Sequence, residues 1–417
     1  MIYTTIKKIC NTSSLLLCLF MLPVSTLAVP THSLAAGNTM IQPSIQIQDG
    51  YDSNIGFTRA NETEDYYTDI SAGLALNYET ELLQLRGAAN AAVVRYAREN
   101  QNDYERYMLD LSGGYQLVER TRLNFGLSYV DDITLRSELE ETGLFYIRSV
   151  QQKYSASAGF TRQLSEVSTL GFNYNYTKTE YGWAGNTDNN AQQIVLSYAR
   201  SLSNQRDSVK VQPSYSRTSS RASDVDTYGL SFGWNHAFSE MSKMNILIGE
   251  EYSKITSSLA QPLIVYNPTL DPPWAVIYNA VNRIEEKWNF VADINLEKTG
   301  ERYSTVIGYN HDLSYSSLGE PTQREKFYLQ GTLTLSERLK AGLSGNLYFN
   351  QSESESYKVD TRYYQLTTYL SYQLTRNGSF RVEYSYANDK DNTLSGDNVA
   401  ERQTVLISLN FGFSKGL

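Results

Sequence analysis

The chain has 417 residues, of which 41% are hydrophobic and 19% charged, with a net charge of −9 and a mean hydropathy of −0.42. The negative balance argues against a nucleic-acid partner, and beyond the N-terminal region no apolar stretch is long enough for a spanning helix. Thirty-three tyrosines in a chain of low hydropathy suit membrane strands, which are apolar on one face only.

Residues 1–35 have the organisation of a cleavable secretory signal. Lys7 and Lys8 precede the apolar run 14–22, and small residues follow it, with cleavage expected after Ala28 or Ala35. An uncleaved membrane anchor is the alternative, for which the apolar run is short. The sequence therefore predicts export and a single mature domain over residues 36–417.

Both cysteines, Cys10 and Cys18, belong to this N-terminal segment. The exported domain is accordingly expected to have no disulfide framework and no cysteine-bound metal. Cys18 invites a lipoprotein interpretation, but Leu17 stands where a lipoprotein signal has a small residue.

From residue 41 onward the chain repeats one unit. Apolar and polar residues alternate along a run, a short turn follows, and a second alternating run leads to a longer polar loop. A period of two residues is typical of a β-strand. Eighteen such strands are predicted, with sixteen as the alternative count, the first over residues 41–51 and the last over 403–413.

The last predicted strand has the cleanest pattern, because one face carries only apolar side chains: Val405, Ile407, Leu409, Phe411 and Phe413. Pairing of this strand with the first, with the apolar face toward lipid, would close a membrane barrel. An alternation that ends in Phe also resembles the C-terminal insertion signal of bacterial outer-membrane proteins, although residues 414–417 follow it here.

The connections between predicted strands alternate in length. Turns such as 79–81 and 203–206 alternate with loops such as 52–65, 135–147 and 219–225. A soluble sandwich of two sheets is the alternative, but it gives no reason for this alternation. The sequence therefore predicts an all-β fold, a transmembrane antiparallel up-and-down β-barrel in the cell outer membrane, with short periplasmic turns and longer extracellular loops. Its expected partners are outer-membrane lipid and the barrel assembly machinery.

A barrel of this size encloses a water-filled lumen. Strand alternation assigns charges of both signs to the lumen: Asp69, Arg86, Asp110, Lys153, Lys210, Lys287, Asp293, Asp312, Arg381 and Glu383. Since no ring of one sign results, strong ion selectivity is not expected. The other inward residues are mostly Ser, Asn, Gln, Thr and Gly. They would suit a hydrated, carbohydrate-like cargo, or they reflect only the wet interior that any such barrel has.

The connection over residues 257–283 is the longest and holds four of the nine prolines. Proline fixes φ and so stiffens a loop. The aromatic side chains of this loop add apolar surface, which a merely solvated loop would not need. We predict a constriction or lid folded into the lumen, with an ordered outer cap as the alternative; its candidate residues are Pro262, Tyr266, Pro268, Pro272, Pro273 and Trp274.

Catalysis finds little support in the sequence. His236 and His311 are placed by alternation on the lipid-facing side, without a partner that the sequence can assign. The acidic clusters 131–132 and 138–141 are interpreted as solvated loop surface rather than a cation site. No phosphate-binding loop and no metal-ligand spacing is found, so neither an enzyme nor a cofactor is predicted. An outer-membrane enzyme or an adhesion barrel remains the alternative from another class.

The end of the first strand reads Tyr51, Asp52, Ser53, Asn54 and Ile55. This segment resembles the opening of the outer-membrane β-barrel porins found with exopolysaccharide export systems, which often begin with Tyr-Asp-(Ser/Asp)-Asn. The resemblance implies a channel of surface-polysaccharide export, with polysaccharide and periplasmic export components as partners. As local chemistry, the same residues favour an Asx-type turn into the first outer loop. A general diffusion porin for small hydrophilic solutes is the alternative function.

Overall fold

The computed structural model describes residues 38–413 and 415–416, except 222, 267–273, 316, 318, 320, 354–357 and 394–397. The predicted secretory signal and both cysteines therefore lie outside the described residues, as do Ser414 and Leu417. None of the helices in the described part is long and apolar enough to cross a bilayer.

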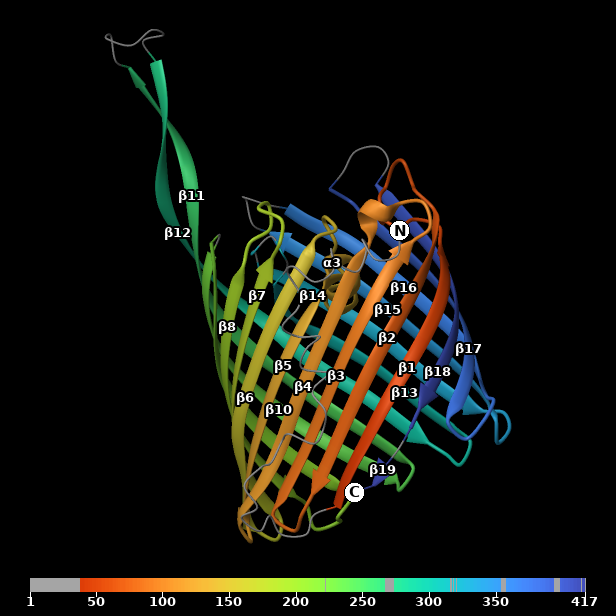
Figure 1. The fold of residues 1–417 in the computed structure, drawn as a ribbon. Helices are drawn as coiled ribbons and strands as arrows, with labels where there is room; N and C mark the ends of the chain where they lie inside the picture. Colours follow the sequence, from red (N-terminus) through yellow and green to blue (C-terminus); the bar gives the residue numbers. More distant parts are fainter. Residues whose placement is uncertain are drawn as a thin grey trace, which may run out of the picture.

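Eighteen antiparallel strands form one closed barrel, in which each strand pairs with its neighbours in the chain and β18 pairs back with β1 (Figure 1). The strands are β1 (Asn38–Asp52), β2 (Asp65–Glu79), β3 (Leu83–Tyr96), β4 (Tyr104–Val118), β5 (Thr121–Ile133), β6 (Val150–Ser165), β7 (Ser168–Tyr181), β8 (Asn189–Ser201), β9 (Asp207–Ser220), β10 (Ser223–Ser239), β11 (Ser242–Tyr266), β12 (Trp274–Thr299), β13 (Tyr303–Tyr315), β14 (Pro321–Thr334), β15 (Leu339–Glu353), β16 (Lys358–Gln373), β17 (Gly378–Asp391) and β18 (Val399–Gly412). A short β19 (Lys415–Gly416), the 3-10 turn η2 (Asn100–Asn102) and the helix α3 (Thr134–Thr142) complete the elements. The predicted fold class is confirmed.

Strand alternation divides the barrel wall into an apolar outside and a polar inside. Ile47 pairs with Leu409, and both side chains point outward, 42% and 38% exposed in the absence of lipid. The neighbouring pair Gln46 and Asn410 lines the interior instead. Exposed apolar side chains are costly in water but favourable in hydrocarbon, so this surface fits a membrane-embedded barrel.

Outward-facing aromatic residues gather toward both ends of the strands. On the side of the longer connections they form cross-strand pairs, among them Tyr129–Tyr154 with ring centroids 5.0 Å apart and Tyr215–Tyr228 at 5.1 Å. The Tyr215 hydroxyl donates to Asp226 at 2.8 Å. Such rings with a polar tip are typical of the two membrane–water interfaces.

The closing seam extends beyond the last long strand. The Phe413 N–H donates to the Pro43 carbonyl at 2.9 Å, and Gly416 pairs with Met40 in continuation of the register in which Gly412 pairs with Ser44. Phe413, Lys415 and Gly416 therefore contribute backbone pairing to barrel closure.

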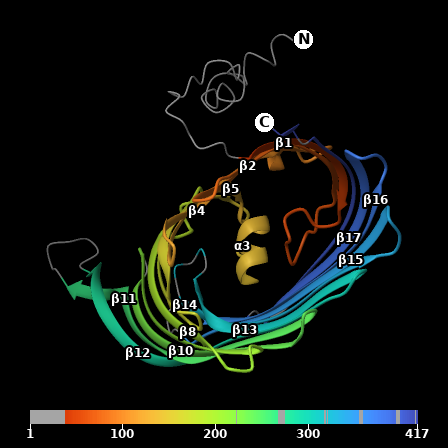
Figure 2. The same cartoon turned by 90° about the horizontal axis from the view of Figure 1, so that it is seen from below.

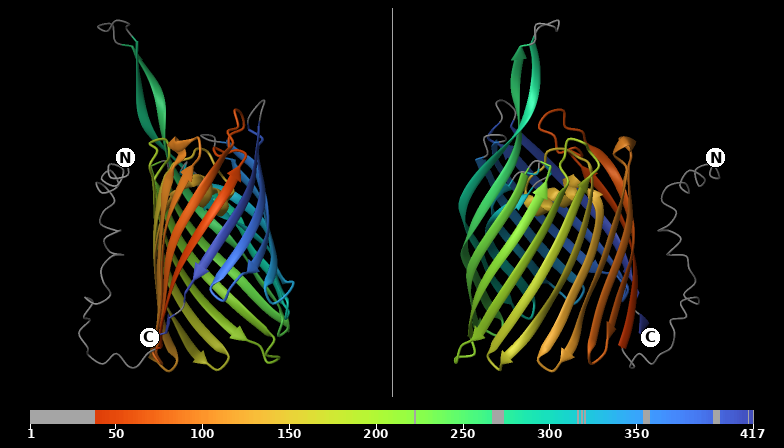
Figure 3. Two further views of the ribbon diagram at one scale, coloured as in Figure 1. Left: turned by 45° about the vertical axis from the view of Figure 1, so that its right-hand side comes forward. Right: turned by 90° about the vertical axis from the view of Figure 1, so that its left-hand side faces the viewer.

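The prediction of a loop over residues 257–283 is wrong. β11 and β12 continue as a paired ribbon from Ser257 opposite Arg283 to Tyr266 opposite Trp274. We call its outer part, residues 258–266 and 274–282, the arm; it extends away from the barrel mouth (Figures 1 and 3). The β-branched and aromatic residues of these segments favour strands, and a two-stranded ribbon has open edges where a proline is tolerated.

The predicted constriction is therefore corrected as well. Pro262, Tyr266 and Trp274 belong to strands that lead away from the lumen, whereas Pro268, Pro272 and Pro273 lie outside the described residues. The alternation of connection lengths also has an exception: β9 and β10 run further than predicted and leave only residues 221–222 between them.

Replacing Phe411 and Phe413 together with Ser should lower the amount of folded barrel in outer membranes several-fold. The Phe411 side chain faces lipid and Phe413 follows it at the closing seam, so the double variant removes apolar contact where the barrel closes. Folded protein would be measured by heat-modifiable gel mobility. Asn392→Ser with Thr393→Ser, in an outer loop, is the control, and equal loss in both variants would contradict the prediction.

Candidate functional site

The candidate site is the lumen. The strand register places all ten predicted lumen charges on the inward face: Asp69, Arg86, Asp110, Lys153, Lys210, Lys287, Asp293, Asp312, Arg381 and Glu383. For example, Asp69 lies opposite Gln48, and both line the same internal cavity. The ten charges are distributed over eight strands rather than brought together in one cluster.

Most of these charges are balanced by a neighbour of opposite sign. Two of these contacts join Lys153 to Glu141 at 2.7 Å and Arg324 to Asp312 at 2.5 Å. Further pairs are Asp69–Arg106, Lys287–Glu285 and Arg381–Glu383. A lumen with locally paired charges presents little net field to a passing solute.

The segment Tyr51–Ile55 fastens the first outer loop to the closing seam. The Arg402 guanidinium contacts the fully buried Asp52 carboxylate through both Nε and Nη2, the shortest distance being 2.6 Å. Asp52 also accepts the Asn54 N–H at 3.0 Å, which is the predicted Asx turn. The Asn54 amide in turn donates to the carbonyl of Glu401 at 3.0 Å. These residues thus lock β1 to β18 at the outer end of the barrel.

The lock also directs the loop over residues 53–64 into the barrel. Phe57 adopts a left-handed backbone conformation, with φ of 48°, and its ring is buried. It lies 6.2 Å from the ring of Tyr363 in an edge-to-face arrangement and 6.1 Å from Phe145. A bulky residue at positive φ is strained, so these contacts must hold it in place.

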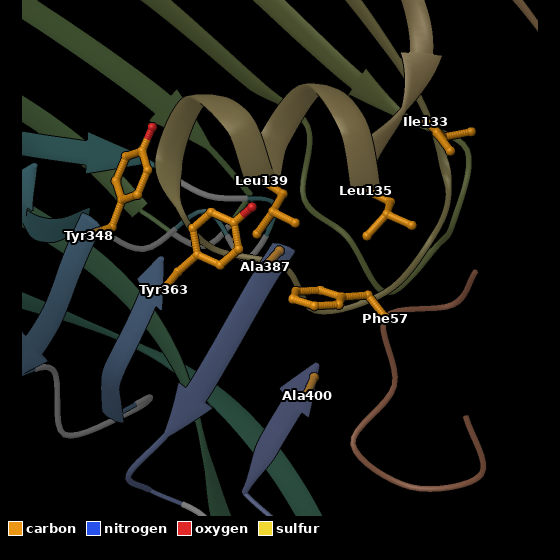
Figure 4. Close-up of a cluster of buried hydrophobic side chains, with 8 residues drawn as sticks. All are labelled: Phe57, Ile133, Leu135, Leu139, Tyr348, Tyr363, Ala387 and Ala400. Atoms are coloured by element: carbon orange, nitrogen blue, oxygen red, sulfur yellow. The ribbon is translucent and has the colours of Figure 1, made fainter. Parts of the chain in front are cut away.

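The helix α3 lies inside the ring of strands (Figure 2). Leu135 and Leu139, one turn apart, face the same side and pack with Phe57 and Tyr363 (Figure 4). Gly143 ends the helix with φ of 69°, and its N–H donates to the Leu139 carbonyl at 2.9 Å. The sequence placed these residues in an outer loop; the structure turns that loop inward.

Several barrel strands hold α3 from different sides. Lys153 of β6 contacts Glu141, and the Arg324 guanidinium of β14 donates to the Glu141 carbonyl at 2.7 Å. On β15 the Tyr348 hydroxyl donates to the Glu140 carbonyl at 2.7 Å. The helix is therefore fastened across the lumen rather than to one wall, and it narrows the passage on the extracellular side.

Glu138 is the buried carboxyl group of this arrangement. Its Oε1 accepts the backbone N–H of Ser317, in the turn between β13 and β14, at 2.7 Å. Burial raises the pKa of the Glu138 carboxyl from its usual 4.5 to about 7. The prediction that residues 138–141 form a solvated acidic surface is thus wrong for Glu138, because the loop that carries it packs inside the barrel.

A cavity of about 540 Å³ lies between α3 and one side of the barrel wall. Near α3 it meets the aromatic side chains of Tyr67, Tyr96, Tyr104 and Tyr363. Farther from the helix its lining is dominated by uncharged amide and hydroxyl groups: Gln46, Gln48, Gln365, Ser371, Ser379, Ser385, Thr404, Ser408 and Asn410. These groups offer hydrogen-bond donors and acceptors without net charge.

His236 and His311 are at the barrel surface. His236 contacts Asp207 at 2.7 Å, a partner that the sequence did not assign, and His311 contacts the Phe290 carbonyl at 2.6 Å. Within the described ranges, no three His, Cys, Asp or Glu residues gather in a way that could hold a metal ion.

Residues 32–216, somewhat less than half of the chain, match the family model described as "Putative beta-barrel porin 2". This match, together with the closed barrel and its lipid-facing exterior, identifies the general type of protein. The chain is a porin-like outer-membrane barrel. No curated protein sequence matches it.

Solved outer-membrane structures resemble the porin-like barrel only in general architecture. OccK9 (OpdG) of Pseudomonas aeruginosa aligns with 92% of this chain and 99% of its own, at 10% identity and a TM-score of 0.45. The closed form of the ferric-catecholate import receptor Fiu of E. coli K12 aligns with 89% and 81%, at 11% identity and 0.45. OccAB1 of Acinetobacter baumannii aligns with 90% and 96%, at 11% identity and 0.43. Similarity at this level gives no information about cargo.

Asp52→Ala should destabilise the folded barrel by roughly 3 kcal/mol, because Arg402 would keep a largely buried charge without its partner. The double variant with Arg402→Ala should recover part of the loss. The measurement is the denaturant midpoint of unfolding in lipid vesicles. Glu105→Gln, which removes a partly exposed contact to Arg95, is the control and should cost less than about 1 kcal/mol. An equal effect in both single variants would refute the structural role of the lock.

Gly143→Val should raise single-channel conductance several-fold. A Cβ at Gly143 would lie 2.4 Å from Cγ of Tyr348, and φ of 69° disfavours a branched residue, so α3 would be displaced from its anchors. Gly331→Val is the matched control, since a Cβ there meets only one backbone oxygen, at 4.0 Å. Unchanged conductance in the Gly143 variant would show that α3 does not limit passage.

Conductance should also increase as the pH rises from about 4.5 to about 7. In this interval the packed helix keeps Glu138 protonated, because its pKa is raised, whereas Glu138 of a released helix would already be ionised. The stability of the packed helix relative to the released one therefore falls as the pH rises through this interval. Above about pH 7 this stability no longer changes. Glu138→Gln should give a flat profile over the same range. A pH dependence that survives this substitution would have another source.

Proposed function

We propose that the protein is an outer-membrane channel for hydrated, carbohydrate-like cargo and that it serves the export of exopolysaccharide or another surface polysaccharide. The observation that carries this proposal is the chemistry of the cavity beneath α3. Its amide and hydroxyl lining can exchange hydrogen bonds with sugar hydroxyls, and among its charged groups Arg381 is paired with Glu383 and Arg402 with Asp52. A neutral polymer would pass without electrostatic trapping.

The helix across the lumen supports an exporter more than a freely open pore. α3 narrows the mouth and is held by Lys153, Arg324 and Tyr348 from several strands, so passage of a polymer would require its displacement. A channel for a polymer delivered from the periplasm benefits from remaining closed between transport events. The resemblance of Tyr51–Ile55 to porins of exopolysaccharide export systems points in the same direction, with periplasmic export components as partners at the inner mouth.

A general diffusion porin for small hydrophilic solutes is the second candidate. The observation in its favour is that the opposite wall is also lined by uncharged side chains, with Asn175 and Gln193 facing inward and hydrogen-bonded to each other at 3.3 Å. Such a lining would admit small sugars as readily as a polymer. Phenotypes of the deleted gene distinguish the two candidates.

Deleting the gene should lower the surface polysaccharide and leave uptake of small sugars unchanged. Complementation with Gln48→Trp, which narrows the cavity, should restore export poorly, whereas Gln193→Trp on the opposite wall should restore it. Polysaccharide would be quantified on intact cells, and outer-membrane levels of each variant would be matched by blot. Normal polysaccharide combined with impaired solute uptake would overturn export in favour of diffusion.

A further inference from the structure

Four tyrosines line the end of the cavity next to α3. Tyr67, Tyr96 and Tyr104 come from the neighbouring strands β2, β3 and β4, and Tyr363 comes from β16. Their hydroxyls make no hydrogen bond with any residue that the structure describes. Because tyrosine hydroxyls in buried surroundings normally have a partner, the partners of these four have to come from what fills the cavity.

The rings of this aromatic wall are held in place from behind. The Arg148 guanidinium lies 5.3 Å from the ring centroid of Tyr96 and 5.5 Å from that of Tyr104. Its Nη2 also donates to the Asn102 carbonyl at 2.6 Å. The Tyr67 ring lies 5.6 Å from that of Tyr96. A ligand that packs on these rings would therefore find them already positioned and lose little affinity to their ordering.

The helix α3 adds an unpaired carboxylate to the same end of the cavity. Glu140 lines the cavity and is exposed, and it forms no ion pair with any of the described residues. The other charged groups of the lining each have a partner, in the pairs Asp69–Arg106, Arg136–Asp132, Arg381–Glu383 and Arg402–Asp52. A carboxylate without a partner accepts hydrogen bonds from hydroxyl groups and repels a second anion.

This combination of groups matches the chemistry of an uncharged sugar ring. Such a ring has an apolar C–H surface that can pack on an aromatic side chain, and hydroxyls at its edge that can donate to Glu140 and exchange hydrogen bonds with Gln48 and Gln365. The volume of about 540 Å³ is in the range of sites for small ligands, roughly 300–1,000 Å³. The carboxylate of an acidic sugar would instead meet Glu140 where every cation of the lining is already paired.

We propose that this end of the cavity is a binding subsite for neutral hexose units, built jointly by the tyrosines of the barrel wall and by Glu140 of α3. The inference rests on the proposed carbohydrate-like cargo. It adds that the cargo is held at one place below the helix rather than only admitted to the lumen, and it does not depend on the direction of transport.

The first test measures binding to the purified full chain in detergent by isothermal titration calorimetry. The probes are neutral oligosaccharides of glucose, mannose and galactose, together with an oligogalacturonate of the same length. At least one neutral probe should bind with saturation, and the oligogalacturonate should bind roughly tenfold more weakly or not at all. Absence of saturable binding by all the neutral probes would overturn the subsite, and equal or tighter binding of the oligogalacturonate would overturn its preference for neutral sugars.

The second test locates the subsite at the tyrosines. The triple variant Tyr67→Phe, Tyr96→Phe and Tyr104→Phe keeps the rings and removes three hydroxyls, so the affinity for the neutral probe should fall roughly tenfold or more. The denaturant midpoint of unfolding should stay the same, because these hydroxyls have no partner in the described protein. Tyr328→Phe, at a lumen-facing position outside the cavity, is the control. Unchanged affinity in the triple variant would place binding elsewhere.

The third test concerns the carboxylate of α3. Glu140→Gln should bring the affinities for the neutral and the acidic probe close together, whereas the matched control Glu297→Gln, which faces the lumen from β12 outside the cavity, should keep their difference. An undiminished difference in the Glu140 variant would contradict its role. These results are separable from the export phenotype: saturable binding combined with normal surface polysaccharide in the deletion strain would refute export alone, and lost polysaccharide without binding would refute the subsite alone.

Discussion

Closure of the sheet is the constraint on which the rest of this structure depends. Strand backbone in hydrocarbon has no water to satisfy its N–H and C=O groups, so the first and last strands must pair with each other. β1 and β18 meet this demand along their length, and the ion pair of Asp52 and Arg402 completes the seam at the outer end. Because Asp52 and Asn54 also shape the following loop, the interaction that closes the barrel directs Phe57 into its lumen.

The interior is organised around the same loop. Phe57 supports the apolar side of α3, while Tyr348 and Arg324 hold the polar backbone of the helix from the far wall. The result is a lumen with a neutral, hydrogen-bonding cavity on one side of the helix and a narrowed mouth on the other. A passage of this kind is consistent with hydrated cargo and with conduction that depends on the position of α3, whose buried Glu138 links that position to proton concentration.

The alternation of apolar and polar residues in the sequence was sufficient to predict much of the barrel wall. It predicted the closing strand with Phe411, and it predicted that side chains such as Asp69 and Arg381 face the lumen. A period of two residues can be recognised from local sequence alone. The inward helix was missed for the opposite reason. Only Leu135, Leu139 and the terminal Gly143 mark it locally, and the hydroxyl of Tyr348 reaches it from 208 residues further along the chain. The arm was misread because its prolines were given more weight than the strand-forming residues between them.

Polymer exclusion in planar bilayers tests most directly whether α3 narrows the extracellular mouth. Neutral polymers of graded size would be added to one side of single oriented channels while conductance is recorded. The structure predicts asymmetry: polymers that enter from the periplasmic side and lower the conductance should be excluded from the extracellular side. Removal of α3 should abolish this difference. Equal access from both sides in the unmodified protein would contradict a mouth narrowed by the helix.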